Sequence, residues 1–233
     1  MEYSINMKPF YICILLLLIG GAEPLSHIGA GKWNGNDTTN ASSHGNSLYA
    51  QLGLASVVSY AAFDRAIRGY DKLEAKKKKL LVVIDFSKPS TEERMCVVDV
   101  QDGKLLHTSH VAHGRNSGEN YATSFSNKPG SHQSSLGFYV TENTYQGRNG
   151  YSLILEGLEK GINDKAKERA IVIHGASYCD PSVIQNAGRL GRSFGCPALP
   201  RDKSKAIIDT IKDGVIIYIY ANDKDYLTQS KML

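Results

Sequence analysis

The sequence predicts a mainly β domain with an N-terminal helix and short peripheral helices. Short apolar runs typical of buried strands recur through the chain, and turns rich in Gly, Ser and Asn separate them. The turn at 101–104 carries the Asp-Gly pair that favours a β-hairpin. Few stretches show helical periodicity, so a β-rich architecture is expected. The predicted strands are 80–86, 94–100, 105–111, 137–141, 152–156, 170–174 and 215–220.

Two stretches have the apolar spacing of helices. Residues 47–72 place apolar side chains at helical intervals, and Asn46 or Ser47 can cap the start. A shorter helix is expected over 203–212, directly before the last strand. Between the third and fourth strands, residues 113–136 are dominated by Gly, Ser, Asn and His and are expected to form loops.

The N-terminus resembles a secretory signal peptide. Lys8 precedes the apolar run 10–19, and small residues at 20–22 provide a cleavage site after Ala22. The run is shorter than the roughly 20 residues that span a bilayer as a helix. We therefore expect residues 1–22 to be removed, which leaves no stable membrane span and places the protein in the periplasm or cell envelope. An uncleaved anchor is the alternative, because Glu2 offsets the positive charge of Lys8.

The remaining chain divides by composition. Residues 23–46 are expected to be a flexible lead-in, 47–79 a helix with a basic linker, 80–221 the β-rich domain and 222–233 a C-terminal tail. The lysine run 76–79 favours a solvated face, with attraction to an anionic envelope surface as the alternative. The net charge of +4 is too diffuse for a nucleic-acid-binding protein.

Cleavage after Ala22 leaves three cysteines: Cys96, Cys179 and Cys196. An odd number in an exported chain suggests a free thiol. Cys96 lies in an apolar strand and is expected to pack in the core. We expect Cys196 to stay free of a disulfide with Cys179.

Cys196 and His174 form the strongest candidate for chemistry. An apolar strand ends at His174, and the turn Ser-Phe-Gly-Cys-Pro follows 19 residues later, at 193–197. Gly195 lets backbone and substrate come close, and Pro197 restrains the chain after the thiol. A thiol in such a turn can use nearby N–H groups to stabilise a thiolate or an oxyanion. The alternative is a buried cysteine and a histidine that never meet.

These residues resemble the YkuD-type L,D-transpeptidases. The order His-Gly, loop, Ser-x-Gly-Cys is similar to the motif of that family, and the wider match is to a subgroup of murein L,D-transpeptidases. The resemblance spans roughly 48–221. It is carried by four blocks: DFSKPS at 85–90, VAHGRNSG at 111–118, SFSNKPGSHQSSLGFY at 124–139 and GRLGRSFGCPALP at 188–200.

The resemblance implies a β-sandwich-like catalytic domain in which Cys196 is the nucleophile and His174 the general base. It also implies that the Gly175 carbonyl orients the imidazole, that N–H groups at Gly195 and Cys196 form an oxyanion hole, and that Ser193 and Arg192 line the site. Neither a metal nor an organic cofactor is required. The sequence departs from the family where Phe194 replaces a common His and Ala198 a common Asn. This departure puts substrate choice and rate in doubt.

The implied partners are peptidoglycan stem peptides, as acyl donor and as acceptor. The thiolate attacks the carbonyl at the L-centre of diaminopimelate, D-alanine leaves, and an amine or water resolves the thioester. A sortase-like transpeptidase is one alternative, although Pro197 and Pro200 disfavour the strand that it needs after the cysteine. The other is a peptidoglycan-binding envelope protein with impaired catalysis, which Phe194 favours.

Two further histidines are candidates for substrate binding. His113 lies in the VAHG block and is expected to border the groove, and His132 lies in the Ser-rich loop 131–135. The series His107, His110, His113 resembles a metal cluster. Residues three apart on a strand point to opposite faces, however, and no carboxylate or cysteine completes a zinc spacing, so we expect no metal site.

Overall fold

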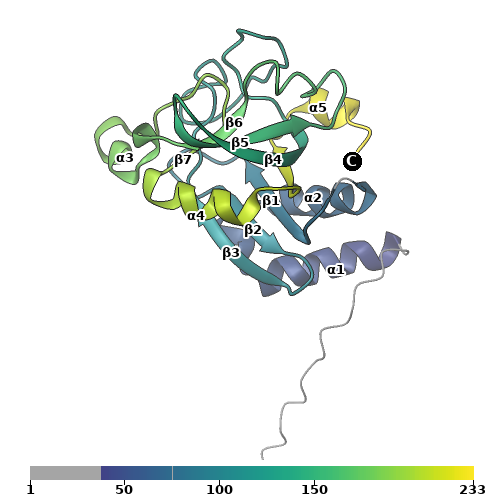
Figure 1. Ribbon diagram of the computed structural model, residues 1–233. Helices are drawn as coiled ribbons and strands as arrows, with labels where there is room; N and C mark the ends of the chain where they lie inside the picture. Colours follow the sequence, from purple (N-terminus) through teal and green to yellow (C-terminus); the bar gives the residue numbers. More distant parts are fainter. Residues whose placement is uncertain (1–37, 75) are drawn as a thin grey trace, which may run out of the picture. The chain divides into compact units, whose positions relative to one another are not determined.

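The computed structural model describes residues 38–74 and 76–233, which lie within one compact unit, Lys32–Leu233. The predicted signal peptide and the lead-in up to residue 37 lie outside the described residues. Eight strands form one mixed sheet in the order β3-β2-β1-β8-β4-β5-β6-β7 (Figure 1). The strands are β1 (Leu80–Asp85), β2 (Met95–Asp99), β3 (Lys104–Ser109), β4 (Gly137–Gly147), β5 (Gly150–Gly157), β6 (Val172–Gly175), β7 (Ala198–Leu199) and β8 (Ile216–Tyr220).

The two edges of this sheet approach each other. An antiparallel bridge pairs Ala112, shortly after edge strand β3, with Ala198 in the opposite edge strand β7. Two backbone hydrogen bonds of 2.8 and 3.3 Å form this bridge. The sheet is therefore nearly closed and barrel-like, and the predicted mainly β fold class is confirmed.

The predicted helix 47–72 is divided in two. Helix α1 (Thr38–Gln51) ends before Gly53, which adopts a left-handed φ of 62° that suits glycine. A 3-10 turn, η1 (Leu54–Ser56), follows. Helix α2 (Tyr60–Lys72) follows and is capped by Ser59, whose side chain accepts a hydrogen bond from the Ala62 N–H. The start of α1 also shows that residues 38–46, expected as part of a flexible lead-in, are helical.

Three more helices flank the sheet. Helix α4 (Arg201–Ile211) matches the predicted helix, whereas α3 (Pro181–Ala187) and α5 (Lys224–Gln229) were not predicted. Helix α5 lies in the segment expected to be a tail. Its Tyr226 is 5% exposed and donates a hydrogen bond to the buried carboxylate of Glu159. The C-terminal segment is therefore part of the packed fold.

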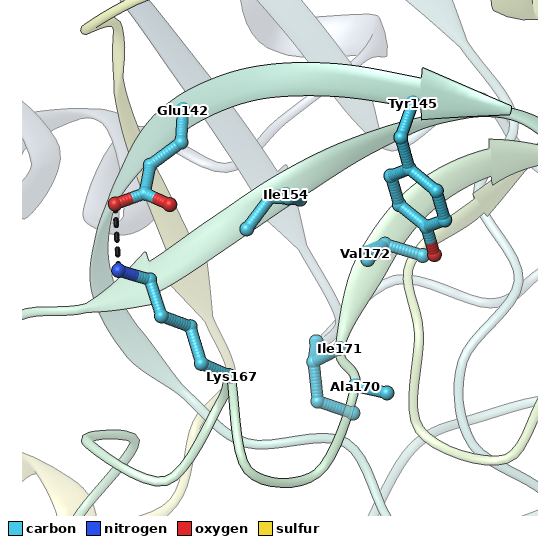
Figure 2. A pocket seen from close by; sticks show the side chains of 7 residues that line it. All are labelled: Glu142, Tyr145, Ile154, Lys167, Ala170, Ile171 and Val172. Atoms are coloured by element: carbon cyan, nitrogen blue, oxygen red, sulfur yellow. Dashed lines mark ion pairs between the residues drawn. The ribbon is translucent and has the colours of Figure 1, made fainter. Parts of the chain in front are cut away.

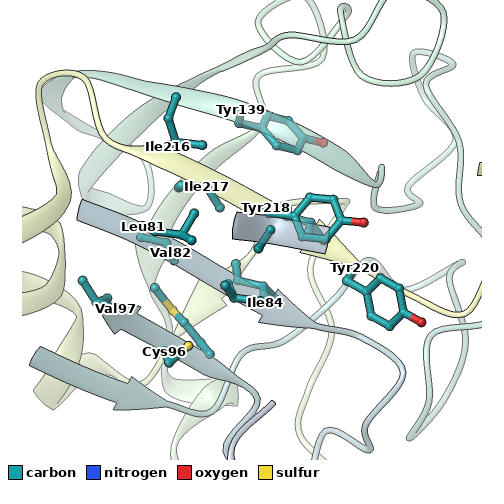
Figure 3. Packing of buried hydrophobic residues seen from close by; sticks show 14 of the residues in the cluster. Leu81, Val82, Ile84, Cys96, Val97, Tyr139, Ile216, Ile217, Tyr218 and Tyr220 are labelled. Atoms are coloured by element: carbon teal, nitrogen blue, oxygen red, sulfur yellow. The ribbon is translucent and has the colours of Figure 1, made fainter. Parts of the chain in front are cut away.

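The core lies around the parallel pair β1 and β8, where consecutive side chains of both strands are buried (Figure 3). Leu81, Val82, Ile216 and Ile217 lose all contact with solvent there. Cys96 in β2 is also fully buried beside them, as its apolar strand predicts. Among residues 38–74 and 76–233, no helix is long and apolar enough to cross a membrane.

Candidate active site

The thiol of Cys196 lies against the backbone of β6. Strand β7 runs parallel to β6 with Ala198 opposite His174, so the chain two residues earlier brings Cys196 beside Val172. The Val172 N–H donates to Sγ at 3.5 Å, and the thiol donates to the Ala170 carbonyl at 3.6 Å. Cys196 is half-buried. Burial raises the pKa of the thiol, whereas the Val172 N–H and the charge of Arg169 oppose that rise.

His174 lies in β6, two positions after Val172, and is 4% exposed. Its Nδ1 lies 3.1 Å from the Gly175 carbonyl oxygen. Because a carbonyl can only accept, Nδ1 carries the proton of the neutral ring and Nε2 keeps its lone pair. Burial lowers the pKa of His174, which favours this neutral form.

His174 thus lies in β6, whereas Cys196 lies two residues before the neighbouring strand β7 and faces Val172 of β6. Within the described ranges no hydrogen bond joins the two side chains, since each bonds to backbone atoms of β6. The Cys196 thiol instead donates to the Ala170 carbonyl.

Gly175 allows α4 to pack closely on β6. A Cβ at this position would lie 2.4 Å from Ser204 Oγ in α4, which is far inside van der Waals contact. The same residue provides the carbonyl that faces the His174 ring. Because Gly175 has no side chain, α4 packs directly against the backbone whose carbonyl faces the His174 imidazole.

The side chain of Ser193 stabilises the turn that leads to Cys196. Ser193 Oγ accepts the Gly195 N–H at 3.0 Å and donates to the Cys196 carbonyl at 2.6 Å. The Gly195 N–H, expected to help form an oxyanion hole, is thus already engaged. No other residue of the described chain accepts a hydrogen bond from the Cys196 N–H, which leaves that group as the available donor.

Sequence blocks far apart in the chain meet at this turn. Gly114 forms a bridge with Ser193. The Ser134 hydroxyl accepts the Gly114 N–H at 3.0 Å and donates to the Gly195 carbonyl at 3.1 Å. Segments 111–118 and 131–135 therefore position the turn that carries Cys196, so three of the four blocks that carry the resemblance meet there.

Arg169 also organises this region, and nothing in the sequence distinguished it. Its guanidinium donates to Ser126 O at 2.7 Å, Ser135 Oγ at 2.8 Å and Gln133 O at 2.5 Å. A Cβ built on Gly195 would lie 3.2 Å from its Nη2. Arg169 thus connects the Ser-rich loop to the thiol turn and brings a positive charge near Sγ.

Two expected site residues are directed elsewhere. Arg192 donates to the Gly118 carbonyl and pairs with Glu119 at 2.7 Å, so its guanidinium holds loop 115–119. His113 is 1% exposed, and its Nδ1 lies 2.8 Å from a nitrogen of buried Arg94. Burial, followed by the charge of Arg94, lowers the pKa of His113 to about 4. His113 is a core residue and does not border an open groove.

Phe194 lies exposed two positions before Cys196 in the chain. Its side chain is 65% accessible, and its ring centre lies 4.6 Å from that of His132. The guanidinium carbon of Arg115 lies 5.8 Å from the same ring. His132, which the sequence makes a candidate for substrate binding, therefore contacts Phe194. Phe194 is the residue that departs from the histidine common in the family that the sequence resembles.

Segment 170–172 also lines a cavity of about 360 Å³ (Figure 2). Ala170 and Val172, whose backbones contact Sγ, also line this cavity. Its remaining lining residues are Glu142, Tyr145, Ile154, Lys167 and Ile171.

The histidine series does not form a metal cluster. His107 pairs with Thr210 and His110 with the Thr91 carbonyl, away from buried His113. In the part of the chain that the structure describes, no three His, Cys, Asp or Glu side chains group closely enough to hold a metal ion.

The family profile described as L,D-transpeptidase catalytic domain matches residues 54–220. No curated protein matches the sequence. An L,D-transpeptidase from Mycobacterium smegmatis is 15% identical with a TM-score of 0.37, over 61% of this chain and 59% of that chain. The helical cell shape determining protein Pgp2 from Campylobacter jejuni is 15% identical with a TM-score of 0.43, over 69% and 55%. L,D-transpeptidase 3 from Mycobacterium tuberculosis is 12% identical with a TM-score of 0.37, over 61% of each chain. The match thus spans less than two thirds of the length of these solved chains.

Proposed function

The chain belongs to the L,D-transpeptidase catalytic domain family, and from that premise we propose that it is a cysteine-dependent L,D-transpeptidase of peptidoglycan stem peptides. Cys196 is the nucleophile and His174 the general base. The Gly175 carbonyl orients the base, and the Cys196 N–H contributes to the oxyanion hole. The observation that carries the proposal is that the half-buried Cys196 thiol lies against Val172 of β6, two positions before the imidazole of His174 in the same strand.

The first step is acyl transfer to the thiol. His174 Nε2 takes the thiol proton, and Sγ attacks the carbonyl carbon at the L-centre of diaminopimelate in a tetrapeptide stem. The tetrahedral oxyanion is stabilised by the Cys196 N–H. The bond to the terminal D-alanine nitrogen breaks, His174 returns the proton to that nitrogen, and D-alanine leaves a thioester behind.

The second step releases the enzyme. An amine from another stem attacks the thioester carbonyl, His174 takes the proton of the amine, and Cys196 leaves as a thiol. The product is a 3–3 cross-link. Water in place of the amine gives net L,D-carboxypeptidase action by the same route. Neither step requires a cofactor.

The proposal includes an exported protein in the periplasm or cell envelope, where peptidoglycan is accessible. It is motivated by the signal-like composition of residues 1–22. The catalytic domain is proposed to extend over 80–221, preceded by the N-terminal helix and basic linker of 47–79.

Mass spectrometry of the protein incubated with tetrapeptide stems tests this function. We expect an adduct of the stem minus D-alanine on the tryptic peptide that contains Cys196, together with free D-alanine in solution. The Cys196→Ala variant should give neither product. Release of D-alanine by that variant at the wild-type rate would contradict the assignment.

A peptidoglycan-binding protein with impaired catalysis is the second candidate. Phe194 favours it, because an exposed phenyl ring can contact ligand but cannot move a proton. This candidate predicts binding of stem peptides without any adduct on Cys196. The mass measurement therefore distinguishes the two functions.

A further inference from the structure

Arg94 is a fully buried cation, and within the described residues its hydrogen bonds go to no carboxylate. Nη1 donates to the Lys88 carbonyl at 2.8 Å, and Nε and Nη2 donate to the Val111 carbonyl at 3.0 and 2.6 Å. Burial lowers the pKa of Arg94 to about 9, so the guanidinium stays charged at neutral pH. A buried charge is costly unless it is well hydrogen-bonded, so Arg94 constrains the groups that accept its bonds.

His113 is the remaining acceptor of Arg94. Its Nδ1 lies 2.8 Å from Arg94 Nη2, and because a guanidinium can only donate, Nδ1 accepts. The proton of the neutral ring is therefore on Nε2, which faces the Gly118 carbonyl at 3.3 Å. The Phe86 ring centre lies 4.8 Å from the guanidinium carbon and 5.9 Å from the imidazole centre. Arg94, His113 and Phe86 thus form one buried cluster that neither step of the proposed reaction uses.

This cluster lies behind the backbone that closes the sheet. We call this closure the seam: residues 111–114 paired with residues 193–198. Ala112 exchanges two backbone hydrogen bonds with Ala198, and the His113 carbonyl accepts the Ser193 N–H at 2.9 Å. Cys196 lies between Ser193 and Ala198 in the chain, so the seam holds both ends of the turn that carries the thiol.

We propose that Arg94 and His113 are positioning residues for the Cys196 nucleophile. Arg94 fixes the Val111 carbonyl and the His113 ring, and the His113 carbonyl holds Ser193 at the start of the thiol turn. Both side chains are buried, so they act through the seam and not by touching substrate. Only one arrangement of segment 111–113 satisfies the buried charge, and a nucleophile needs a single, well-defined position. This assignment rests on the proposed function and adds two residues to it.

Two substitutions of His113 separate positioning from simple packing. His113→Gln keeps an oxygen that can accept from Arg94 and an N–H that can donate to the Gly118 carbonyl, whereas His113→Leu keeps neither. We expect His113→Leu to lower kcat for D-alanine release at least about tenfold with KM within about twofold of wild type. The physical reason is that a displaced nucleophile slows the chemical step more than it weakens binding. His113→Gln should restore kcat to within about threefold of wild type.

Hydrogen–deuterium exchange provides a readout that does not depend on activity. In His113→Leu, amide exchange should become at least about tenfold faster in the peptide that contains residues 193–198, while β1 and β8 stay protected as in wild type. Arg94→Lys is the second variant. It keeps the charge but cannot reach all the acceptors of a guanidinium, so it should show the same local increase in exchange.

Tyr226→Phe is the matched control. It also removes a buried hydrogen bond, from the Tyr226 hydroxyl to Glu159 at 3.2 Å. In the described part of the chain, no hydrogen bond of Tyr226 reaches the seam. This variant should lower the unfolding temperature but leave kcat and the exchange of residues 193–198 unchanged.

The proposal is overturned if His113→Leu keeps the wild-type kcat, or if His113→Gln loses as much activity as His113→Leu. It is also overturned if exchange rises equally in the seam and in β1 and β8, because the cluster would then contribute only to overall stability. The proposed transpeptidase function fails by a separate result, the absence of an adduct on wild-type Cys196. Because the exchange comparison needs no turnover, the two failures are distinguishable.

Discussion

The backbone N–H of Val172 points at the Sγ atom of Cys196 from 3.5 Å, within the strand that carries His174 two positions later. The same sulfur donates to the Ala170 carbonyl, so the thiol is protonated in this arrangement. Burial raises the pKa of Cys196 and lowers the pKa of His174. The Cys196 thiol and the His174 imidazole are therefore both uncharged in this arrangement and do not form a thiolate–imidazolium pair.

The first prediction concerns the acidic limb of the pH–rate profile. A general base works only when it is unprotonated, and burial lowers the pKa of His174 below its usual 6.5. We expect kcat/KM for D-alanine release to be constant near neutral pH and to fall only below pH 6.5. His174→Ala should remove this limb and reduce acylation by roughly two to four orders of magnitude. A limb that persists unchanged in His174→Ala belongs to another group and would contradict the assignment.

The charge of Arg169 provides a second prediction. This guanidinium lowers the pKa of the Cys196 thiol against the larger effect of burial. Removing the charge should raise that pKa further, so Arg169→Met should shift the rate of iodoacetamide alkylation to higher pH. Arg169→Lys keeps the charge and should shift the profile less. An identical alkylation profile in all three proteins would show that Arg169 acts only through its bonds to the Ser-rich loop.

A third prediction separates the three described cysteines. All three thiols are free, and Cys96 and Cys179 are fully buried, which raises the pKa of each to about 12. Cys96→Ala and Cys179→Ala should keep kcat/KM within about twofold and lower the free energy of unfolding by about 1–2 kcal/mol, since each removes a small buried group. Only Cys196→Ala should abolish D-alanine release. Loss of release in a folded Cys179→Ala protein would give the second thiol a role.

The sequence predicts the strands of this fold better than its helix boundaries. Apolar runs mark β1, β2 and β8 because these strands are buried on both faces, and the Asp-Gly turn marks the hairpin of β2 and β3. The division of the N-terminal helix depends on a tertiary contact. The Ser59 N–H donates to buried Asp85 at the end of β1, which the local pattern cannot reveal. Strand β7 was also missed, because two residues between prolines carry no periodicity.

The residues of the candidate site could also be predicted only in part from the sequence. Cys196, His174 and Gly175 could be proposed from their spacing and from the resemblance. The structure places His174 and Gly175 in β6 and the Cys196 thiol against Val172 of the same strand. The partners of His113 and Arg192 are Arg94 and Glu119, each more than 15 positions away in the chain, so these contacts could not be foreseen from the local sequence. Arg169 was missed for the same reason, since its acceptors are carbonyls and hydroxyls of a remote loop.

The last prediction concerns Gly195, the residue before the nucleophile. Its φ of 124° lies in a region that residues with side chains rarely adopt, and a Cβ there would lie 2.8 Å from the Gln133 carbonyl oxygen. Gly195→Ala must therefore displace the Ser-rich loop or the turn that carries Cys196. We expect a loss of about 2–3 kcal/mol in the free energy of unfolding. We also expect a reduction of at least about tenfold in kcat/KM, since small displacements of a nucleophile are costly.

Gly188→Ala is the matched control, because Gly188 also has a positive φ, 68°, but no atom lies within 4 Å of its built Cβ. That variant should lose about 1 kcal/mol of stability and keep its activity, as urea unfolding and D-alanine release would measure. Equal effects of the two substitutions on kcat/KM would show that the close approach at Gly195 has no part in placing the thiol.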